Sequence, residues 1–317
     1  MSKKVRIVLI RILFFILLVV GLLLLFSNQI QAYLMRSSSQ EMVITNFTAE
    51  DVKRNKEKSK PTFDFEAVEP ISTEAVLKAE LKKAELKREM RAQASELDAD
   101  VENNQDDTAG TTTNSSTNHS GNQKNNSTNN SNNDDEKNQS GSRRAGNTNN
   151  GGNAAGNDDN RNDNNFYSSP AYPVVAGIAI PSVNINLPIF LGVANEYLLW
   201  GAGTLSADQV MGQGNYALAS HLSYDPNALF SPLVNVSTGD KIYTNDLENI
   251  YVYEAYAKEW VAPDAMYVLD DVSGQAIITL VTCGEFDASN RLIVHGTLTD
   301  VIPVDQAPSE ILNAFTF

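Results

Sequence analysis

Hydrophobic residues are distributed unevenly along this chain of 317 residues, in three stretches of different pattern. An almost unbroken apolar run covers residues 7–26 and is interrupted by Arg11 and Gly21. Polar residues then dominate to about position 170, and the remainder consists of short apolar segments separated by Pro, Gly and Asn. Because only this last part carries enough apolar side chains to bury a core, we predict a single folded domain.

The apolar run predicts a transmembrane helix. A helix of about 20 residues is roughly 30 Å long, which matches the hydrocarbon core of a bilayer. Positive residues lie on its N-terminal side, so the N-terminus should stay in the cytoplasm while the rest of the chain is exported. The rival interpretation is a cleaved signal peptide, which we disfavour because the run is long and no small-x-small site follows Phe26. Residues 1–36 are therefore predicted to be a cytoplasmic tip and a retained single-pass membrane anchor.

The polar middle of the chain predicts a stalk over residues 37–100 and a linker over 101–168. Residues 37–61 show no clear period, whereas residues 72–97 combine a thin apolar stripe with many charges and predict a helix. This helix could pack on the folded domain, act as a rigid spacer, or be solvated without a partner. The linker is rich in Asn, Ser, Gly, Asp and Thr, and we expect it to be disordered because no apolar burial offsets its chain entropy.

The last part of the chain predicts a mainly β domain over residues 169–305, followed by a C-terminal tail over 306–317. Many short apolar segments at close spacing are typical of an antiparallel barrel or sandwich. The predicted strands cover residues 175–180, 185–190, 216–220, 241–244, 250–260, 276–282 and 292–298, with short helical turns at 195–200 and 228–233.

Candidate chemistry lies at the ends of two of these strands. The segment Ile-Ile-Thr-Leu-Val-Thr-Cys ends in Cys283, the only cysteine of the chain, and Arg291 follows eight residues later. A second apolar strand ends in His221. A thiol, an imidazole and a guanidinium at strand ends are the parts of a thiol acyl-transfer site. Taken one by one, they also fit a small buried hydrophobe, a core histidine and a surface ion pair.

The strand Thr-Leu-Val-Thr-Cys, the short loop to Arg291 and the upstream strand ending in His221 together resemble the sortase family of cysteine transpeptidases, and within it class A. The segments Gly-Ile-Ala-Ile-Pro at 177–181 and Asn-Ile-Asn-Leu-Pro-Ile at 184–189 also match the usual opening of that domain. The resemblance covers roughly residues 174–298. It implies a closed eight-stranded sortase-type β-barrel with short helices, which here would be preceded by the transmembrane helix, the charged helix and the disordered linker.

The resemblance also implies roles for individual residues. Cys283 would be the nucleophile, His221 the acid and base, and Arg291 the group that stabilises the oxyanion and binds substrate. The groove for the sorting signal would be lined by Ala219, Val281 and Thr282. One departure is Ser220, because class A members usually carry glycine before the catalytic histidine. His295 lies inside a strand only four residues from Arg291, and we expect it to be structural.

The function implied by the resemblance is cleavage of LPXTG-type signals between Thr and Gly through a thioester acyl-enzyme. The Thr carboxyl would then be joined to an amine of a cell-wall precursor of the lipid II type. Expected partners are surface proteins that bear this signal, the precursor and the plasma membrane, with the catalytic domain on the extracellular face. Some relatives bind calcium, but no ligand set can be matched in the acidic loops, so we predict no metal and no other cofactor.

Charge and local context limit the alternatives. The net charge of −15 argues against nucleic acid as a partner, because a phosphate backbone requires a basic face. A pilin-polymerising or other-class sortase remains an alternative, although no lid segment is evident before the domain and no membrane segment is evident after Leu298. Papain-like peptidases and L,D-transpeptidases place their cysteine in a different local context. A non-catalytic, surface-displayed binding barrel is the last alternative.

Overall fold

The computed structural model describes residues 3–64, 68–103 and 171–316. The chain divides into two compact units, one formed by Met1–Ala92 with Asp159–Phe317 and the other by Gln93–Asp158. In the second unit the structure describes only the end of a helix. Residues 104–168 of the predicted linker lie outside the described residues, so its disorder and the domain boundaries stay predictions.

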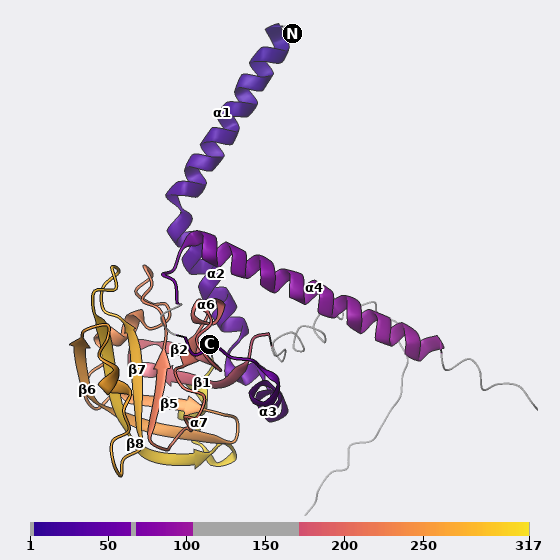
Figure 1. Ribbon diagram of the computed structural model, residues 1–317. Coiled ribbons are helices and arrows are strands. Elements are labelled where there is room, and N and C mark those ends of the chain that lie inside the picture. The colour runs from indigo at the N-terminus through magenta and orange to yellow at the C-terminus, as the bar shows by residue number, and fades with distance from the viewer. Residues whose placement is uncertain (1–2, 65–67, 104–170, 317) are drawn as a thin grey trace, which may run out of the picture. The chain divides into compact units, whose positions relative to one another are not determined.

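The C-terminal part of the first unit is a closed β-barrel of eight strands (Figure 1). Around the barrel, the strand order is β1-β2-β3-β4-β7-β8-β6-β5. The strands are β1 Val174–Ile180, β2 Ile185–Phe190, β3 Ala202–Thr204, β4 Asn215–Ala219, β5 Lys241–Asn245, β6 Asn249–Val261, β7 Ile277–Cys283 and β8 Arg291–Pro303. The predicted closed eight-stranded barrel is therefore confirmed, and all seven strands expected from the pattern are present.

The expectation of a purely antiparallel sheet is wrong at two places. Strand β3 is parallel to β2, and β7 is parallel to β4, whereas the other pairs are antiparallel. Strand β3 follows β2 after a crossover that contains Asn195–Leu198, whereas β4 and β7 are distant in the chain, and a local pattern of apolar residues reveals neither pairing. As a consequence, β4 and β7 end side by side at the same edge of the barrel.

Short helical elements connect the strands. They are η2 Pro181–Val183, α6 Asn195–Leu198, η3 Ser231–Asn235, η4 Met266–Leu269, η5 Val304–Gln306 and α7 Ser309–Asn313. Both predicted helical turns are present as α6 and η3. The predicted C-terminal tail folds back onto the barrel, because the side chain of Phe315 is completely buried.

The N-terminal part of the first unit is helical. It contains α1 Lys3–Leu25, α2 Ser27–Glu41, η1 Ile44–Asn46, α3 Ala49–Lys58 and the first turns of α4, Thr73–Asn103. Residues 37–61 show no clear period in the sequence, yet α2 extends into this stretch and α3 lies within it. Helix α3 begins with a capping box, in which Thr48 and Asp51 each accept a hydrogen bond from the backbone of the other.

These N-terminal elements share one apolar core with the barrel. Ile44, Phe47 and Val76 belong to the same cluster of buried residues as Ile178 on β1. A Cβ atom added to Gly177 would come within 2.6 Å of Ile44 Cγ2, so glycine is what lets Ile44 pack on β1. This contact explains why all seven residues of β1 are buried, on its outer face as well as its inner face. Among the alternatives for the charged helix, the structure shows the first turns of α4 packed on the domain.

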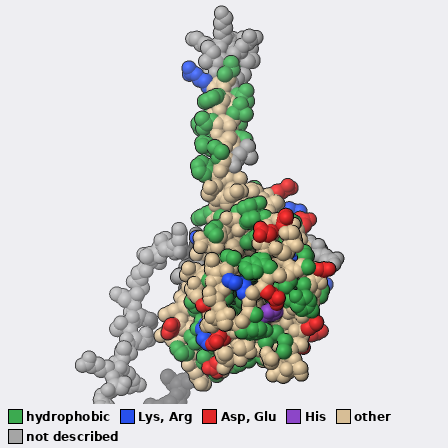
Figure 2. Space-filling model, turned by 90° about the vertical axis from the view of Figure 1, so that its left-hand side faces the viewer, with side chains coloured by type: hydrophobic (Ala, Val, Ile, Leu, Met, Phe, Trp, Pro, Cys, Tyr) green, Lys and Arg blue, Asp and Glu red, His purple; other side chains and the backbone are tan. Residues whose placement is uncertain are grey.

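Apolar side chains cover the described length of α1 (Figure 2). Within the described residues, length and composition qualify no individual helix as a membrane span, whereas the segments Ile10–Leu22 and Ser27–Glu41 qualify as a pair with a bend of 61° between them. Only the first member of that pair is predominantly apolar, and the second packs on the barrel through Met35 and Ser39. The membrane anchor therefore stays a prediction.

Candidate active site

The parallel pairing of β4 and β7 brings two candidate residues to one edge of the barrel. Ala219 lies opposite Val281 in the register, and the backbone N–H of Ser220 donates to the carbonyl of Val281 at 3.1 Å. His221 follows Ala219 by two residues, as Cys283 follows Val281. The imidazole and the thiol therefore come from equivalent positions on adjacent strands.

Arg291 reaches the same edge from the next strand. The antiparallel pairing of β7 and β8 places it directly opposite Cys283. The three residues line one cavity of about 140 Å³, so the structure brings together the whole trio predicted from the sequence. The cavity is also lined by Val68, Glu69, Pro70, Ile71, Leu198, Ser220, Leu222, Tyr224, Glu285, Phe286 and Ala288.

His221 is buried, with only 8% of its surface exposed. Burial removes water from the imidazole, which disfavours its charged form and lowers the pKa of His221 from 6.5 to about 4. The side chain is therefore neutral at pH 7. Its ring can accept a proton, whereas a preformed imidazolium is not the resting state of this site.

Ser220 is firmly held beside the histidine. Its hydroxyl donates to the carbonyl of Gly201 at 2.7 Å, and its side chain is buried. The departure from the glycine usual in class A members is thus accommodated by an additional hydrogen bond. Because that bond ties the end of β4 to the segment leading into β3, Ser220 helps to fix the position from which His221 emerges.

The guanidinium of Arg291 is only partly satisfied. Its Nη1 donates to the carbonyls of Ala288 and Asn290, at 2.9 and 3.1 Å, which anchors it to the loop between β7 and β8. Its Nε is buried and has no hydrogen-bond partner among the described residues. A buried donor without a partner costs about 1–3 kcal/mol, so this atom is suited to an oxygen supplied by a ligand.

Arg291 also lines a second cavity, of about 600 Å³. Its walls include apolar side chains of four elements, among them Leu205, Val261, Val268, Val281 and Ile293. Arg291 lines both cavities, so this second cavity, the apolar groove, adjoins the first, the candidate catalytic cavity, at its side chain. Such a groove fits an extended peptide with apolar side chains.

The three predicted substrate-binding residues lie in different environments. Val281 lines the apolar groove, and Ala219 belongs to the small apolar cluster beneath it. Because side chains alternate along a strand, Thr282 faces the opposite side of β7 from Val281 and Cys283. Its hydroxyl is buried and has no hydrogen-bond partner among the described residues. The substrate-binding role of all three stays a prediction.

Sequence reasoning missed the segment that precedes α4. Val68–Ile71 lie at the catalytic cavity, and Phe63 and Asp64 lie at the apolar groove. Two hydrogen bonds of 2.8 Å hold this segment, from the N–H of Val193 to the carbonyl of Thr62 and from the N–H of Glu69 to Asn195 Oδ1. The segment has no hydrophobic period, so nothing in its pattern placed it here.

Two aromatic side chains at the cavity were also missed. Tyr224 follows His221 by three residues, and Phe286 follows Cys283 by three. Their rings stack with centroids 4.3 Å apart and an angle of 10° between the planes, although both side chains are more than half exposed. The stack joins the loop that carries the histidine to the loop that follows the cysteine.

His295 is held within the sheet, away from these cavities. Its Nδ1 lies 3.0 Å from Thr279 Oγ1, its Nε2 lies 3.6 Å from Glu259, and its ring stacks on Tyr256. Burial lowers the pKa of His295, and the nearby carboxylate of Glu259 opposes that shift. These contacts occupy both ring nitrogens and favour a structural role.

Comparisons with known proteins all indicate the same family. A family model described as a sortase domain matches residues 178–299. Sortase A of Streptococcus agalactiae serotype III (strain NEM316) is 44% identical over 149 residues, which cover 45% of this chain and 60% of that protein. YwpE of Bacillus subtilis (strain 168), classed as a sortase, is 37% identical over 94 residues, which cover 29% of this chain and 91% of that protein.

Among solved structures, sortase A of Listeria monocytogenes is 39% identical. The match covers 45% of this chain and 96% of that one, with a TM-score of 0.42. The chain spans about three fifths of the length of the Sortase A proteins it matches, 60% for the streptococcal protein and 56% for the curated Listeria monocytogenes one.

Proposed function

This chain belongs to the sortase family, and from that membership we propose that it is a class A cysteine transpeptidase. It cleaves LPXTG-type sorting signals between Thr and Gly and attaches surface proteins to an amine of a cell-wall precursor. The observation that carries the proposal is the convergence of Cys283, His221 and Arg291 on one cavity, which adjoins an apolar groove at Arg291.

The first half of the reaction is acyl transfer to the thiol. The sulfur of Cys283 attacks the Thr carbonyl carbon while its proton passes to His221, whose neutral imidazole is the form that can accept it. The carbonyl oxygen becomes an oxyanion, which the unpaired Nε–H of Arg291 is suited to stabilise. The C–N bond then breaks, and His221 returns the proton to the departing Gly amine.

The apolar groove is proposed to hold the residues of the signal that precede the scissile bond. Leu205, Val261 and Ile293 offer apolar walls, and Arg291 stands where the groove meets the thiol. A signal that begins with Leu and Pro supplies apolar side chains of matching character. Its backbone would lie extended along the edge where β4 and β7 end.

The protein is proposed to be held at the plasma membrane by α1, with the barrel on the extracellular face. The described part of α1 carries exposed apolar side chains, including Ile10, Leu13, Phe14 and Phe15. No globular partner covers them in the described structure, and hydrocarbon is the solvent in which such a surface is stable.

A transpeptidation assay with the full-length protein in detergent tests this function. We expect a fluorescent LPXTG peptide and triglycine to give a joined product, and Cys283→Ala to abolish it. Arg291→Ala should lower kcat/KM by about 10²–10³-fold, the loss typical of a removed oxyanion donor. Lys241→Ala removes another cation of the barrel, one paired with Glu254 on the surface, and should have no effect. Equal losses in the two cation variants would contradict the role of Arg291.

A pilin-polymerising sortase is the second candidate. The sequence shows no evident lid segment before the domain, which counts against this candidate. The residues before α4 nevertheless lie at the catalytic cavity, where a lid segment would lie, and this position favours it. This enzyme would join the signal to a lysine side chain rather than to the N-terminal amine of a peptide. Comparing triglycine with Nα-acetyl-lysine amide as acceptors separates the two candidates.

A further inference from the structure

A transpeptidase must hold two substrates, and the apolar groove accounts for only the first. The second substrate, an amine, has to approach the thioester on Cys283 from a side that the sorting signal leaves open. Arg291 lines both the groove and the catalytic cavity, whereas His221 and Tyr224 line the catalytic cavity and not the groove.

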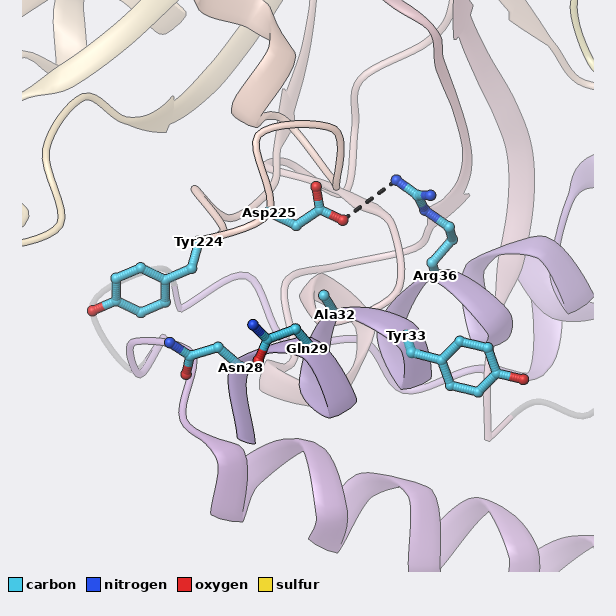
Figure 3. Close-up of a pocket in the computed structure, with 7 residues that line it drawn as sticks. All are labelled: Asn28, Gln29, Ala32, Tyr33, Arg36, Tyr224 and Asp225. Carbon is cyan, nitrogen blue, oxygen red and sulfur yellow. Dashed lines mark hydrogen bonds and ion pairs between the residues drawn. The ribbon is translucent and has the colours of Figure 1, made fainter. Parts of the chain in front are cut away.

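A third cavity, of about 610 Å³, is lined by Tyr224 and by residues of α2 (Figure 3). One wall is helix α2, and the other is the loop that follows His221. Tyr224 also lines the catalytic cavity, so the two cavities adjoin at its side chain. The lining residues are Asn28, Gln29, Ala32, Tyr33, Arg36, Tyr224 and Asp225.

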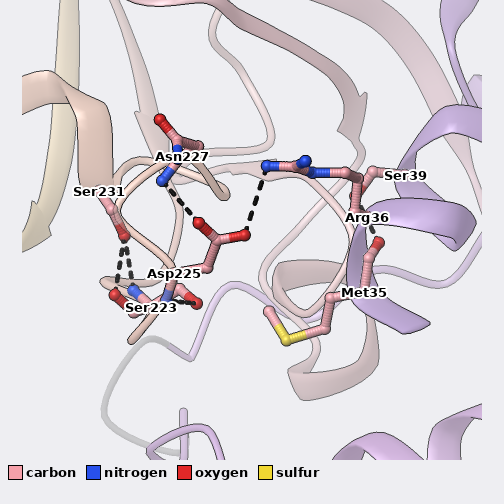
Figure 4. Close-up of polar contacts among 7 residues, drawn as sticks. All are labelled: Met35, Arg36, Ser39, Ser223, Asp225, Asn227 and Ser231. Atoms are coloured by element: carbon pink, nitrogen blue, oxygen red, sulfur yellow. Dashed lines mark hydrogen bonds and ion pairs between the residues drawn. The ribbon is translucent and has the colours of Figure 1, made fainter. Parts of the chain in front are cut away.

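The loop wall of this cleft is pre-organised. The N–H of Ser223 donates to Ser231 Oγ at 2.7 Å, and Asp225 accepts the backbone N–H of Asn227 at 2.9 Å (Figure 4). Asp225 also lies 3.3 Å from the Nη2 of Arg36 on α2, which joins the two walls at one end of the cleft. The helix wall is fixed too, because the Ser39 hydroxyl donates to the Trp200 carbonyl.

The chemistry of the cleft matches a peptide. The side-chain amides of Asn28 and Gln29 can donate to and accept from peptide groups, and Figure 3 shows Asn28 directed toward the ring of Tyr224. That ring is 63% exposed and offers an apolar face. The volume lies within the range of about 300–1,000 Å³ that is usual for ligand sites.

The charges around the catalytic cavity favour an amine at the end of the peptide that lies nearest Cys283. Glu69 and Glu285 line the catalytic cavity, and the barrel around them is acidic. A peptide amine is largely an ammonium at pH 7, so these carboxylates attract it toward the thioester. The nearest cations, Arg36 and Arg291, are each engaged by oxygen atoms of the protein.

We propose that the cleft between α2 and the loop after His221 binds the acceptor, a short peptide that ends in a primary amine. The inference rests on the proposed transpeptidase function and assigns its second substrate a site. Helix α1 ends at Leu25 and the cleft begins at Asn28, so a membrane-held precursor would meet the enzyme beside its own anchor.

The transfer step balances with the groups present. The ammonium first loses one proton to solvent, and the nitrogen lone pair then forms the C–N bond with the acyl carbon. The C–S bond breaks as the amide forms. The second proton on nitrogen passes to the neutral His221 and from there to the departing sulfur of Cys283, which regenerates the free enzyme.

The test compares two amines of different size on the full-length protein in detergent. Hydroxylamine is small enough to resolve the thioester without a binding cleft, whereas triglycine requires one. We expect Gln29→Ala to raise the KM for triglycine about fivefold and Ala32→Trp, which fills the cleft, to raise it more than tenfold. Gln40→Ala changes an exposed glutamine of the same helix outside the cleft and should leave this KM unchanged.

Release of hydroxamate by hydroxylamine should be the same in all four proteins, which also shows that the variants are folded. An unchanged KM for triglycine in Gln29→Ala and Ala32→Trp would overturn the cleft while leaving the transpeptidase function standing. If the wild-type protein forms no hydroxamate at all, the function itself fails and the cleft with it.

Discussion

At the scale of single residues, burial rather than identity decides how the candidate site works. From the sequence alone, His221 and Cys283 could form either an ion pair or a neutral acid–base pair, but His221 is almost completely enclosed and its pKa is lowered to about 4, so it is neutral at pH 7. The sequence predicted the three candidate side chains because their types and contexts match a known motif. It could not reveal the protonation of His221 or the unpaired Nε of Arg291, since both depend on neighbours from distant segments.

The buried His221 predicts a specific dependence of stability on pH. Its pKa is about 4 in the folded protein and near 6.5 when unfolded, so between these values the unfolded chain binds more protons. The free energy of unfolding should therefore fall as the pH drops from 6.5 to 4, by up to about 3 kcal/mol from this residue.

Urea unfolding of the wild type and of His221→Asn at several pH values measures this contribution. The variant should lose less stability than the wild type over the same interval. Glu259 and the aspartates also respond to acid, and they are common to both proteins, so only the difference between them reports on His221. Parallel curves for the two proteins would contradict a neutral, buried histidine.

At the scale of elements, the parallel pairing of β4 and β7 is the feature that builds the site. Each strand is short and apolar, and the pattern predicted both within a residue or two. Their pairing is non-local, because β5 and β6 lie between them in the chain, and no local signal encodes it. Strand β3 was missed because three residues, Ala-Gly-Thr, are too few to show alternation.

The segment between α2 and α4 is the element that sequence reasoning misjudged most. We predicted a polar stalk here because its apolar residues show no period, yet Ile44 and Phe47 complete the core against β1. The contact of Ile44 with Gly177 links a residue of the predicted stalk to the first strand of the barrel.

Ile44→Ala should therefore destabilise the barrel itself. Ile44 is fully buried, and truncating such a side chain typically lowers the free energy of unfolding by about 2–5 kcal/mol. Leu81→Ala on the exposed face of α4 removes a similar number of carbon atoms and should change it by less than about 0.5 kcal/mol. Chemical denaturation followed by tryptophan fluorescence reads out the barrel through Trp200. Equal stability of the two variants would mean that the segment does not dock.

At the scale of the whole molecule, two further cavities adjoin the one that Cys283 lines. The apolar groove, the catalytic cavity and the cleft against α2 share Arg291 and Tyr224 as their junctions. All three are completed by residues that precede the barrel, among them Phe63 and Asp64, Val68–Ile71 and those of α2. The full-length protein is therefore the form in which activity and acceptor affinity should be measured.

The most direct test of the account is mass spectrometry of the full-length protein after brief mixing with an LPXTG peptide. We predict an increase in mass equal to the acyl part of the peptide up to Thr, located on the fragment that contains Cys283. The adduct should disappear when triglycine is added and be absent from Cys283→Ala. A wild-type protein that cleaves the peptide without ever carrying the adduct, or carries it on another residue, would contradict the account.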